Sequence, residues 1–306
     1  MSAPDEQLLS ELRPRGFAIA YRMLGSVSEA EDVVQEGLLR VHQALERGER
    51  IDSPGAYLAT VVTRLAIDEL RSARARRETY VGEWMPEPLI TDERDDPARH
   101  AETADSLSMA FLVLLESLSP EQRAVFLLRE VFDYPFDVYC STIAWSQDAT
   151  RQIAVRARGH VEAGRPRFEA DRERREELAD RFFAAVQEGD LGGLEALLTE
   201  DVALHGDGGG KAPALARPVH GRERVARTLS AWRKAGALAG GASFERLSVN
   251  GQPGAIARSR DGRLFSVIAL DIAEGRIQGI RSVVNPEKLS HIGPVVNLGE
   301  LLSGEA

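Results

Sequence analysis

The sequence has little cysteine, no long apolar run and no excess of positive charge, and each shortage excludes a class of protein. Cys140 is the only cysteine among 306 residues, so neither an internal disulfide nor a cysteine-rich zinc site is possible. No apolar run approaches the ~18 residues of a membrane-spanning helix. The first residues also lack the basic stretch followed by an apolar one that marks a secretory signal. These absences predict a cytoplasmic protein with no membrane partner.

The distribution of charge is more informative than its total. The net charge of −10 argues against a chain that coats nucleic acid without specificity. Residues 64–77 nevertheless carry five arginines against two acids, and residues 151–167 carry five against one. Between them, residues 83–105 hold eight acids against two arginines. Two basic elements therefore flank an acidic segment, in a chain long enough for two or three domains.

The first 80 residues have the pattern of three helices. A first amphipathic helix is predicted to stop near Gly25, and Ser28 is predicted to cap a second one with acids in its first turn. A third helix starts near residue 56 and ends in the arginine-rich stretch. The apolar positions of the second helix recur at helical spacing and predict the face toward a core: Val33, Val34, Leu38, Val41 and Leu45.

The middle of the chain combines a linker with a second helical region. Residues 83–105 contain three prolines and the acid cluster, which predicts an extended linker. Residues 107–168 are helical again, and Ser119 followed by Pro120 marks the start of one helix. A short helix and turn then lead to a basic helix that begins at Ser146. Two helices joined in this way, the second basic, are typical of a helix-turn-helix module.

The character of the sequence changes after residue 172. An amphipathic helix pair is interrupted at Gly189, and five short alternating segments follow. Asn-Gly, Asp-Gly and Glu-Gly pairs separate the last four of these segments, as expected for strands joined by tight turns. The pattern predicts an α+β domain in which N-terminal helices pack on a curved antiparallel sheet.

Residues 205–211, His-Gly-Asp-Gly-Gly-Gly-Lys, look like a phosphate or metal site at first sight. A phosphate-binding loop needs Ser or Thr after its lysine and a helix behind it. Here Ala212 follows Lys211 and no helical pattern begins. His205 and Asp207 are two ligand candidates only, with His220 a distant third. We therefore expect no metal, no cofactor and no phosphate-binding loop here.

Several segments resemble the extracytoplasmic-function (ECF) sigma factors of bacteria. Residues 20–43 (AYRMLGSVSEAEDVVQEGLLRVHQ) are similar to their second conserved region, and residues 118–137 with 151–168 to their fourth. WMPEP at 84–88, DGGGK at 207–211 and NPEKL at 285–289 resemble motifs of the SigJ-like subgroup, in which a SnoaL-like domain of the NTF2-like fold follows the sigma domains.

The resemblance implies a multidomain chain: two all-α sigma domains, the second a helix-turn-helix, followed by an α+β cone with a curved antiparallel sheet. Residues 1–82 would be sigma region 2 and 83–106 the acidic linker. Residues 107–168 would be sigma region 4 and 169–306 the SnoaL-like regulatory domain. The implied activity is to direct core RNA polymerase to specific promoters, through the β′ clamp and β flap of the polymerase and through promoter DNA.

The resemblance assigns residues to these contacts. The exposed face of the second helix would bind the β′ clamp helices through Asp32, Gln35 and Glu36, although a solvated acidic face gives the same pattern. The third helix would contact and open the upstream promoter element through Arg64, Asp68, Arg71, Arg74, Arg76 and Arg77. Against this, Arg64 and Arg71 could simply pair with Asp68 on the helix surface.

The helix-turn-helix would contact DNA through Ser146, Gln147, Thr150, Arg151, Arg156 and Arg158. An ordinary helical hairpin is the alternative. The segment also departs from the family pattern, because Ala144 and Trp145 occupy the turn and Tyr139 and Cys140 replace small aliphatic residues in the first helix. These departures affect the expected sequence preference more than the module.

In the subgroup the fused domain takes over the task of a separate anti-sigma factor. The implied contacts between domains involve Trp84 and Pro86 of the linker, Asp207, Gly208, Gly209, Gly210 and Lys211, and Asn285, Pro286, Glu287, Lys288 and Leu289. A small ligand in the C-terminal pocket is a further expectation. We expect no catalytic residue.

An enzyme is the alternative to this regulatory interpretation. SnoaL-like domains include cyclases, and ketosteroid isomerase shares the fold. Such a site needs a carboxylate with a raised pKa in an apolar cavity. His205 and Asp207 lie two apart on one strand, so both could line a pocket with Trp232, Phe244 and Phe265. The chain would then be a SnoaL-like enzyme, of cyclase or isomerase type, fused to a DNA-binding module.

Overall fold

The fold is given by a computed structural model, which describes residues 3–91, 105–164, 171–238 and 240–303. The chain divides into two compact units. The N-terminal unit consists of residues 1–79 and 112–165, and the C-terminal unit consists of residues 80–111 and 166–306. The two helical regions therefore belong to one unit, whereas the first part of the predicted linker belongs to the other.

Three helices open the N-terminal unit: α1 (Ala3–Leu24), α2 (Val27–Glu46) and α3 (Pro54–Glu78). The predicted cap was wrong by two residues, because Ser26 and not Ser28 accepts the Glu29 N–H, at 3.2 Å. The Ser28 hydroxyl lies 3.2 Å from that of Ser26 instead. The predicted inner face of α2 is confirmed at its centre, where Val34 and Val41 are fully buried.

The second half of the N-terminal unit contains α5 (Met109–Leu115, shared with the other unit), α6 (Pro120–Phe126), the π-helical turn η1 (Leu127–Val131), α7 (Phe136–Ile143) and α8 (Gln147–Gly164). Ser119 caps α6 as predicted, in a reciprocal arrangement with Gln122. Helices α7 and α8 are the predicted helix-turn-helix. Ala144 takes a left-handed conformation (φ 53°) in the turn, and Ser146 accepts the Ala149 N–H at 3.3 Å.

The C-terminal unit is built on a sheet with strand order β1-β4-β5-β6-β7-β2-β3. Its strands are β1 (Ile90–Thr91), β2 (Leu198–Asp207), β3 (Val219–His220), β4 (Ala242–Val249), β5 (Gln252–Ser259), β6 (Leu264–Ala273) and β7 (Arg276–Val283). The turns at Asn250-Gly251 and Glu274-Gly275 have the positive φ angles that their sequence predicts. The sheet is antiparallel apart from the parallel pair of β2 and β7.

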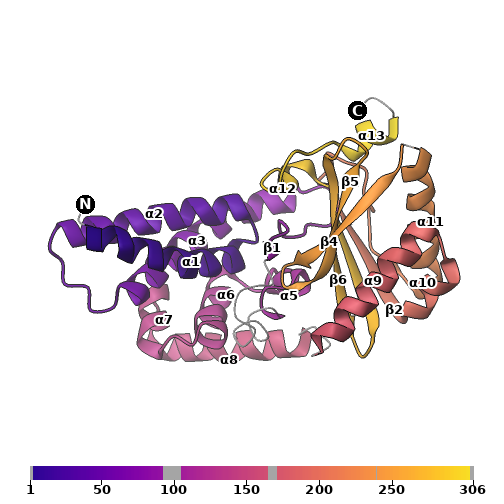
Figure 1. Ribbon diagram of the computed structural model, residues 1–306. Helices are drawn as coiled ribbons and strands as arrows, with labels where there is room; N and C mark the ends of the chain where they lie inside the picture. The colour runs from indigo at the N-terminus through magenta and orange to yellow at the C-terminus, as the bar shows by residue number, and fades with distance from the viewer. Residues whose placement is uncertain (1–2, 92–104, 165–170, 239, 304–306) are drawn as a thin grey trace. The chain divides into compact units, whose positions relative to one another are not determined.

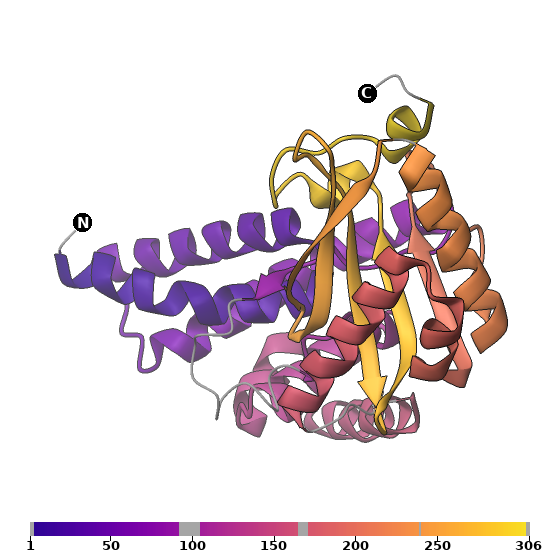
Figure 2. The same cartoon turned by 45° about the vertical axis from the view of Figure 1, so that its right-hand side comes forward.

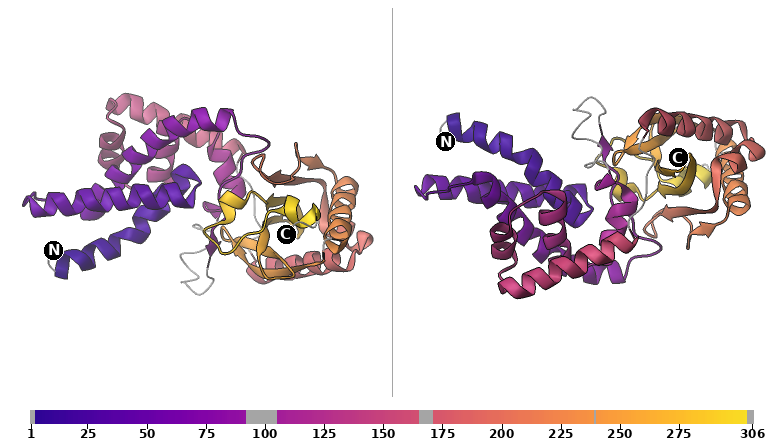
Figure 3. Two further views of the ribbon diagram at one scale, coloured as in Figure 1. Left: turned by 90° about the horizontal axis from the view of Figure 1, so that it is seen from above. Right: turned by 90° about the horizontal axis from the view of Figure 1, so that it is seen from below.

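Helices α9 (Arg172–Glu188), α10 (Leu191–Leu197) and α11 (Arg222–Leu238) cover one face of this sheet (Figures 1 and 2). The predicted break at Gly189 is confirmed, whereas α11 was not predicted. The core between helices and sheet includes Phe182, Leu204 and Ile280. Short helices α12 (Pro286–Leu289) and α13 (Leu298–Ser303) follow the last strand. Helix α13 lies beyond one end of the strands (Figure 1), so it is near the centre of this unit when the unit is seen from that end (Figure 3).

Within the described ranges, no helix combines the length and the apolar character needed to cross a membrane.

Candidate functional site

The three short motifs of the sequence meet at one buried carboxylate. Asp207, the last residue of β2, is fully buried. One of its oxygens accepts a hydrogen bond from the Tyr80 hydroxyl at 2.6 Å. The other accepts from the Met85 backbone N–H at 2.8 Å and from the Lys288 ammonium at 2.7 Å. We call Tyr80, Met85, Asp207 and Lys288 the linker anchor, because they tie the predicted linker to the C-terminal domain.

Lys288 completes this anchor with a buried positive charge. Only 7% of the residue is exposed, and its ammonium also donates to the Met85 carbonyl. The same ammonium lies 4.7 Å from the centre of the Tyr80 ring and 4.6 Å from the centre of the Trp84 ring. Aromatic faces attract a cation more strongly when water is excluded. Burial, and then the hydrogen bond to the Asp207 carboxylate, raise the pKa of Tyr80 far above its usual range, so this phenol stays neutral.

The glycines after Asp207 are required by close packing. Gly209 has a φ of 58°, and a Cβ atom there would collide with the Asn285 amide and lie 2.8 Å from the Tyr80 hydroxyl. Asn285 donates to that hydroxyl at 3.0 Å and caps α12 through its side-chain oxygen. Lys211 closes the turn with an exposed ion pair to Glu287. The DGGGK turn is therefore a packing surface for NPEKL and for the linker.

Substitution of Gly209 tests this packing. Gly209→Ala is expected to loosen the linker, seen as faster proteolysis within residues 80–91, because the methyl group needs the space that Asn285 and Tyr80 occupy. Gly48→Ala is the control, since Gly48 has a similar φ of 71° with no atom within 4 Å of the added Cβ. It should cost only the ~1 kcal/mol of a strained backbone. Equal loosening by both changes would contradict the packing role.

The rest of segment 80–91 is also bound to the domain. Strand β1 pairs with β4, Ile90 opposite Val249. Asn250 is fully buried and accepts the Leu89 N–H at 2.9 Å. His291 donates to the Pro88 carbonyl at 2.9 Å, and Glu83 pairs with His205 at 2.8 Å.

No pattern in the sequence indicates the linker contacts of Tyr80, Glu83, Asn250 or His291. Asn250 shows only its turn signal, and the partners lie more than 120 residues apart in the chain. The remaining linker residues, 92–104, lie outside the described part.

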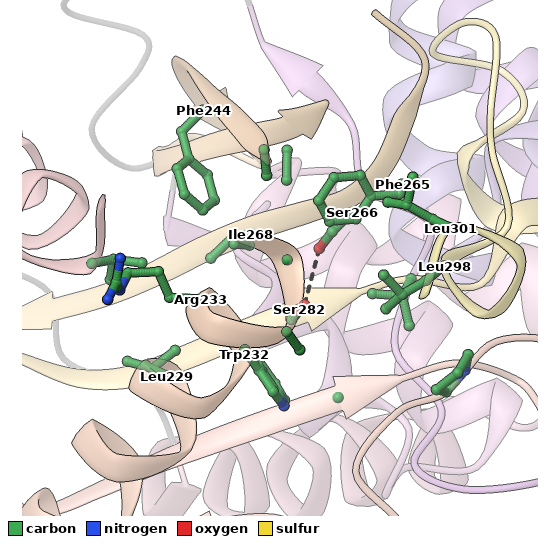
Figure 4. Close-up of a pocket in the computed structure, with 18 of the residues that line it drawn as sticks. Leu229, Trp232, Arg233, Phe244, Phe265, Ser266, Ile268, Ser282, Leu298 and Leu301 are labelled. Atoms are coloured by element: carbon green, nitrogen blue, oxygen red, sulfur yellow. Dashed lines mark hydrogen bonds between the residues drawn. The ribbon is translucent and has the colours of Figure 1, made fainter. Parts of the chain in front are cut away.

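The structure separates His205 and Asp207 from the pocket. Phe244, Phe265 and Trp232 line the pocket as expected (Figure 4). The residue of β2 that lines it is Gly206. Since side chains alternate along a strand, His205 and Asp207 point to the opposite side, where they hold the linker. Among the described residues that line the pocket there is no carboxylate and no imidazole. The structure therefore contradicts the alternative in which these two residues line an acid–base pocket.

The predicted polymerase-binding face of α2 lies on the surface. Asp32 and Gln35 are exposed, and Glu36 is half-buried with an ion pair to Arg40 at 2.8 Å. Asp32 forms no ion pair with a described residue. The face therefore presents acidic and amide groups on a rigid helix, as its pattern predicts.

The arginines of α3 contact the second helical region of the same unit. Arg64 donates to the backbone carbonyls of Ser141 and Thr142 at 2.6 and 2.9 Å, at the end of α7. Arg71 pairs with Glu121 of α6 at 2.7 Å and with Asp68 at 3.4 Å. Surface pairing with Asp68 thus occurs for Arg71 but not for Arg64. The side chains of Arg74, Arg76 and Arg77 lie outside the described residues.

On the helix-turn-helix, Gln147, Arg151, Arg156 and Arg158 are exposed along α8, which is where a DNA-reading helix needs them. Ser146 uses its hydroxyl as the helix cap. Thr150 differs from expectation, because it is fully buried and its hydroxyl donates to the Ser146 carbonyl at 3.0 Å. It presents no polar atom to a DNA groove in this conformation.

No group of three or more His, Cys, Asp or Glu side chains in the described ranges is arranged to hold a metal ion.

The chain matches two protein-family models. The family model of sigma-70 region 2 matches residues 8–76, and that of the SnoaL-like domain matches residues 179–277. The chain thus joins a sigma region to a SnoaL-like domain. It is 37% identical to the ECF RNA polymerase sigma factor SigJ of Mycobacterium tuberculosis H37Rv over 91% of both chains. It is 31% identical to the probable ECF RNA polymerase sigma factor SigI of M. tuberculosis CDC 1551, over 89% of this chain and 90% of that one.

A crystal structure of M. tuberculosis SigJ is also similar, with a TM-score of 0.74, 32% identity and coverage of 95% of this chain and 99% of that chain. The chain belongs to the ECF RNA polymerase sigma factors and carries a SnoaL-like C-terminal domain. This confirms the family and the fold expected from the motifs. Family membership implies core RNA polymerase and promoter DNA as partners, and it favours the sigma-factor interpretation over a fused enzyme.

Proposed function

We propose that the SnoaL-like domain regulates this sigma factor in cis by holding the segment that follows region 2. It does so without catalysing a reaction and without a separate anti-sigma factor. The linker anchor carries the proposal: a carboxylate and an ammonium, both buried, hold Tyr80 and Met85 of that segment. No carboxylate and no imidazole is found among the described residues of the pocket wall, which supports a regulatory role over catalysis.

The place of the anchor in the chain supports this coupling. Helix α3 ends at Glu78 and the first anchored residue is Tyr80, so only Thr79 separates them. A tether this short keeps the effective concentration of the domain near region 2 very high. A weak interface is then sufficient to shift the equilibrium between closed and open arrangements of the sigma regions.

Two contacts within the N-terminal unit support a resting state in this proposal. Arg64 and Arg71, expected to contact promoter DNA, are bound to region 4 residues of the same unit. Promoter phosphates would have to compete with these partners, so DNA binding and separation of the two regions are linked. In the open state we assign base contacts to Gln147 and Arg151, at the start of α8, and phosphate contacts to Arg156 and Arg158. Region 4 would then meet the β flap.

Run-off transcription with purified core polymerase tests the regulatory proposal. Full-length protein is compared with a chain ending at residue 170, which lacks the domain, and with one ending near residue 205, which lacks Asp207 and Lys288. We expect the full-length chain to differ in promoter output from both shorter chains, because only the full-length chain retains the anchor. Identical output from all three would refute regulation in cis.

We further propose that Asp32, Gln35 and Glu36 dock on the clamp helices of the polymerase β′ subunit. Asp32→Lys is expected to weaken binding to core polymerase about tenfold, which corresponds to ~1.4 kcal/mol, because it places like charges at a complementary interface. Titration of labelled protein with core polymerase measures this. Glu300→Lys, an exposed charge reversal in α13, is the control. Unchanged affinity of folded Asp32→Lys would remove the assignment.

A further inference from the structure

The SnoaL-like domain contains a cavity that takes no part in the proposed regulation. Its volume is about 540 Å³, within the ~300–1,000 Å³ of typical sites for small molecules. The wall is mainly apolar and aromatic (Figure 4), with Phe244, Ile268 and Phe265 from the sheet and Leu229 and Trp232 from α11. Leu298 and Leu301 of α13 lie at one end of the cavity. Such a wall suits an apolar body larger than a few carbon atoms.

The few polar groups of the wall narrow the class of ligand. The hydroxyls of Ser266 and Ser282 hydrogen-bond to each other at 3.0 Å, so one of their two O–H donors is already used within the wall. Arg233 is the only ionisable residue among the described wall residues. Its Nε–H is buried without a hydrogen-bond partner, and no described acid pairs with it. A guanidinium without an acidic partner favours an incoming anion, which would contact its terminal nitrogens because the Nε atom is closed off from solvent.

The position of Arg233 fits one end of an elongated ligand. It lies with Phe244 at the end of the cavity away from Leu298 and Leu301 (Figure 4). Its guanidinium packs against Gly189, where α9 ends. A helix C-terminus favours a cation but does not neutralise it. Trp232, the neighbour of Arg233 on α11, lines the cavity and is still 39% exposed, so the wall reaches solvent beside the arginine.

We propose that this cavity binds an amphipathic monocarboxylic acid. The carboxylate pairs with Arg233 near the opening, where it stays partly hydrated. The apolar body extends between Phe244 and Trp232 toward Leu298 and Leu301, and α13 covers its far end. Charge selects the ligand and the apolar wall holds it. This binding site does not depend on the proposed regulation, since it needs only the wall residues of one domain.

Calorimetric titration of the full chain with decanoate and with decan-1-ol tests the proposal. The two probes share an apolar chain, which ends in a carboxylate in decanoate and in a neutral hydroxyl in decan-1-ol. We expect decanoate to bind at least about tenfold more tightly than decanol, and Arg233→Gln to bring the two affinities together. Arg233→Lys, which keeps the charge, should retain most of the preference. Arg260→Gln, an exposed arginine outside the cavity wall, is the control and should leave the preference unchanged.

The ratio of the two affinities is taken within one preparation, so it does not depend on the fraction of each variant that folds. A wild-type protein that binds both probes equally would overturn the proposal, as would one that binds neither. A preference that survives in Arg233→Gln would overturn the role of Arg233. None of these outcomes bears on the transcription test, so failure of the ligand site is distinguishable from failure of regulation in cis.

Discussion

Asp207→Asn is expected to lower the free energy of unfolding of the C-terminal unit by about 3 kcal/mol, since it leaves the buried Lys288 ammonium without its counter-ion. The Asp207 side chain is completely buried and that of Lys288 is 9% exposed, so water cannot replace the lost partner. Asparagine keeps one acceptor oxygen, so it can accept from Tyr80 or from Met85 but not from both. The expected loss therefore combines the unpaired charge with one lost hydrogen bond to the linker.

Urea unfolding followed by Trp84 fluorescence measures this loss, in a Trp145→Phe/Trp232→Phe background that leaves Trp84 as the only tryptophan. Trp84 reports the anchor directly, because its ring packs on the Lys288 ammonium. Adding Lys288→Met to Asp207→Asn should restore part of the stability, since it removes the unpaired charge.

The chain offers a matched control in the same two motifs. Lys211 and Glu287 also join DGGGK to NPEKL, but their side chains are 48% and 66% exposed. Lys211→Met should therefore cost less than about 1 kcal/mol. If it costs as much as Asp207→Asn, or if the double variant is no more stable than Asp207→Asn alone, the buried ion pair does not hold the linker.

The second large effect is expected at Arg123, which joins the two sigma regions inside the N-terminal unit. The side chain is 3% exposed and donates to the Met23 carbonyl at the end of α1 at 2.6 Å. It also donates to the Leu115 carbonyl and to the Glu116 carboxylate, each at 2.7 Å. Arg123→Met keeps the apolar stem and removes every donor. The unsatisfied acceptors should lower the free energy of unfolding by about 3 kcal/mol.

Trp145 is the only tryptophan of this unit, so its fluorescence in a Trp84→Phe/Trp232→Phe background follows the unfolding. Arg47→Met is the control, because Arg47 pairs with Glu49 on the surface with 60% of its side chain exposed. It should change stability by no more than about 0.5 kcal/mol. Comparable losses from the two variants would show that Arg123 does not join the regions.

Local signals in the sequence predicted most elements correctly. Ser119 with Pro120 marked the start of α6, and the Asn-Gly and Glu-Gly pairs marked two hairpin turns, because caps and tight turns depend on a few adjacent residues. Two exceptions are instructive. At α2, Ser26 and Ser28 are both good caps and the pattern cannot rank them. Helix α11 follows a segment with two prolines, and its small and charged residues give a weak apolar stripe.

The candidate site was predictable only in part, because its contacts are non-local. The motifs indicated that WMPEP, DGGGK and NPEKL matter, but not that they meet at Asp207. Tyr80 and Asn250 carry no distinguishing spacing, and their partners come from segments brought together only by the sheet. The alternation along β2 predicted correctly that His205 and Asp207 share a side. It could not say which side faces the cavity, because that depends on where α11 packs.

Strand β2 carries the cavity wall and the linker contact on two consecutive residues, Gly206 and Asp207. Gly206 faces the interior, and a Cβ there would lie 3.1 Å from the Leu215 backbone and 3.3 Å from its side chain. Leu215 is itself part of the cavity wall. Asp207, the next residue of the strand, accepts hydrogen bonds from Tyr80 and Met85 of the linker. The cavity wall and the linker anchor are therefore joined through the single peptide bond between Gly206 and Asp207.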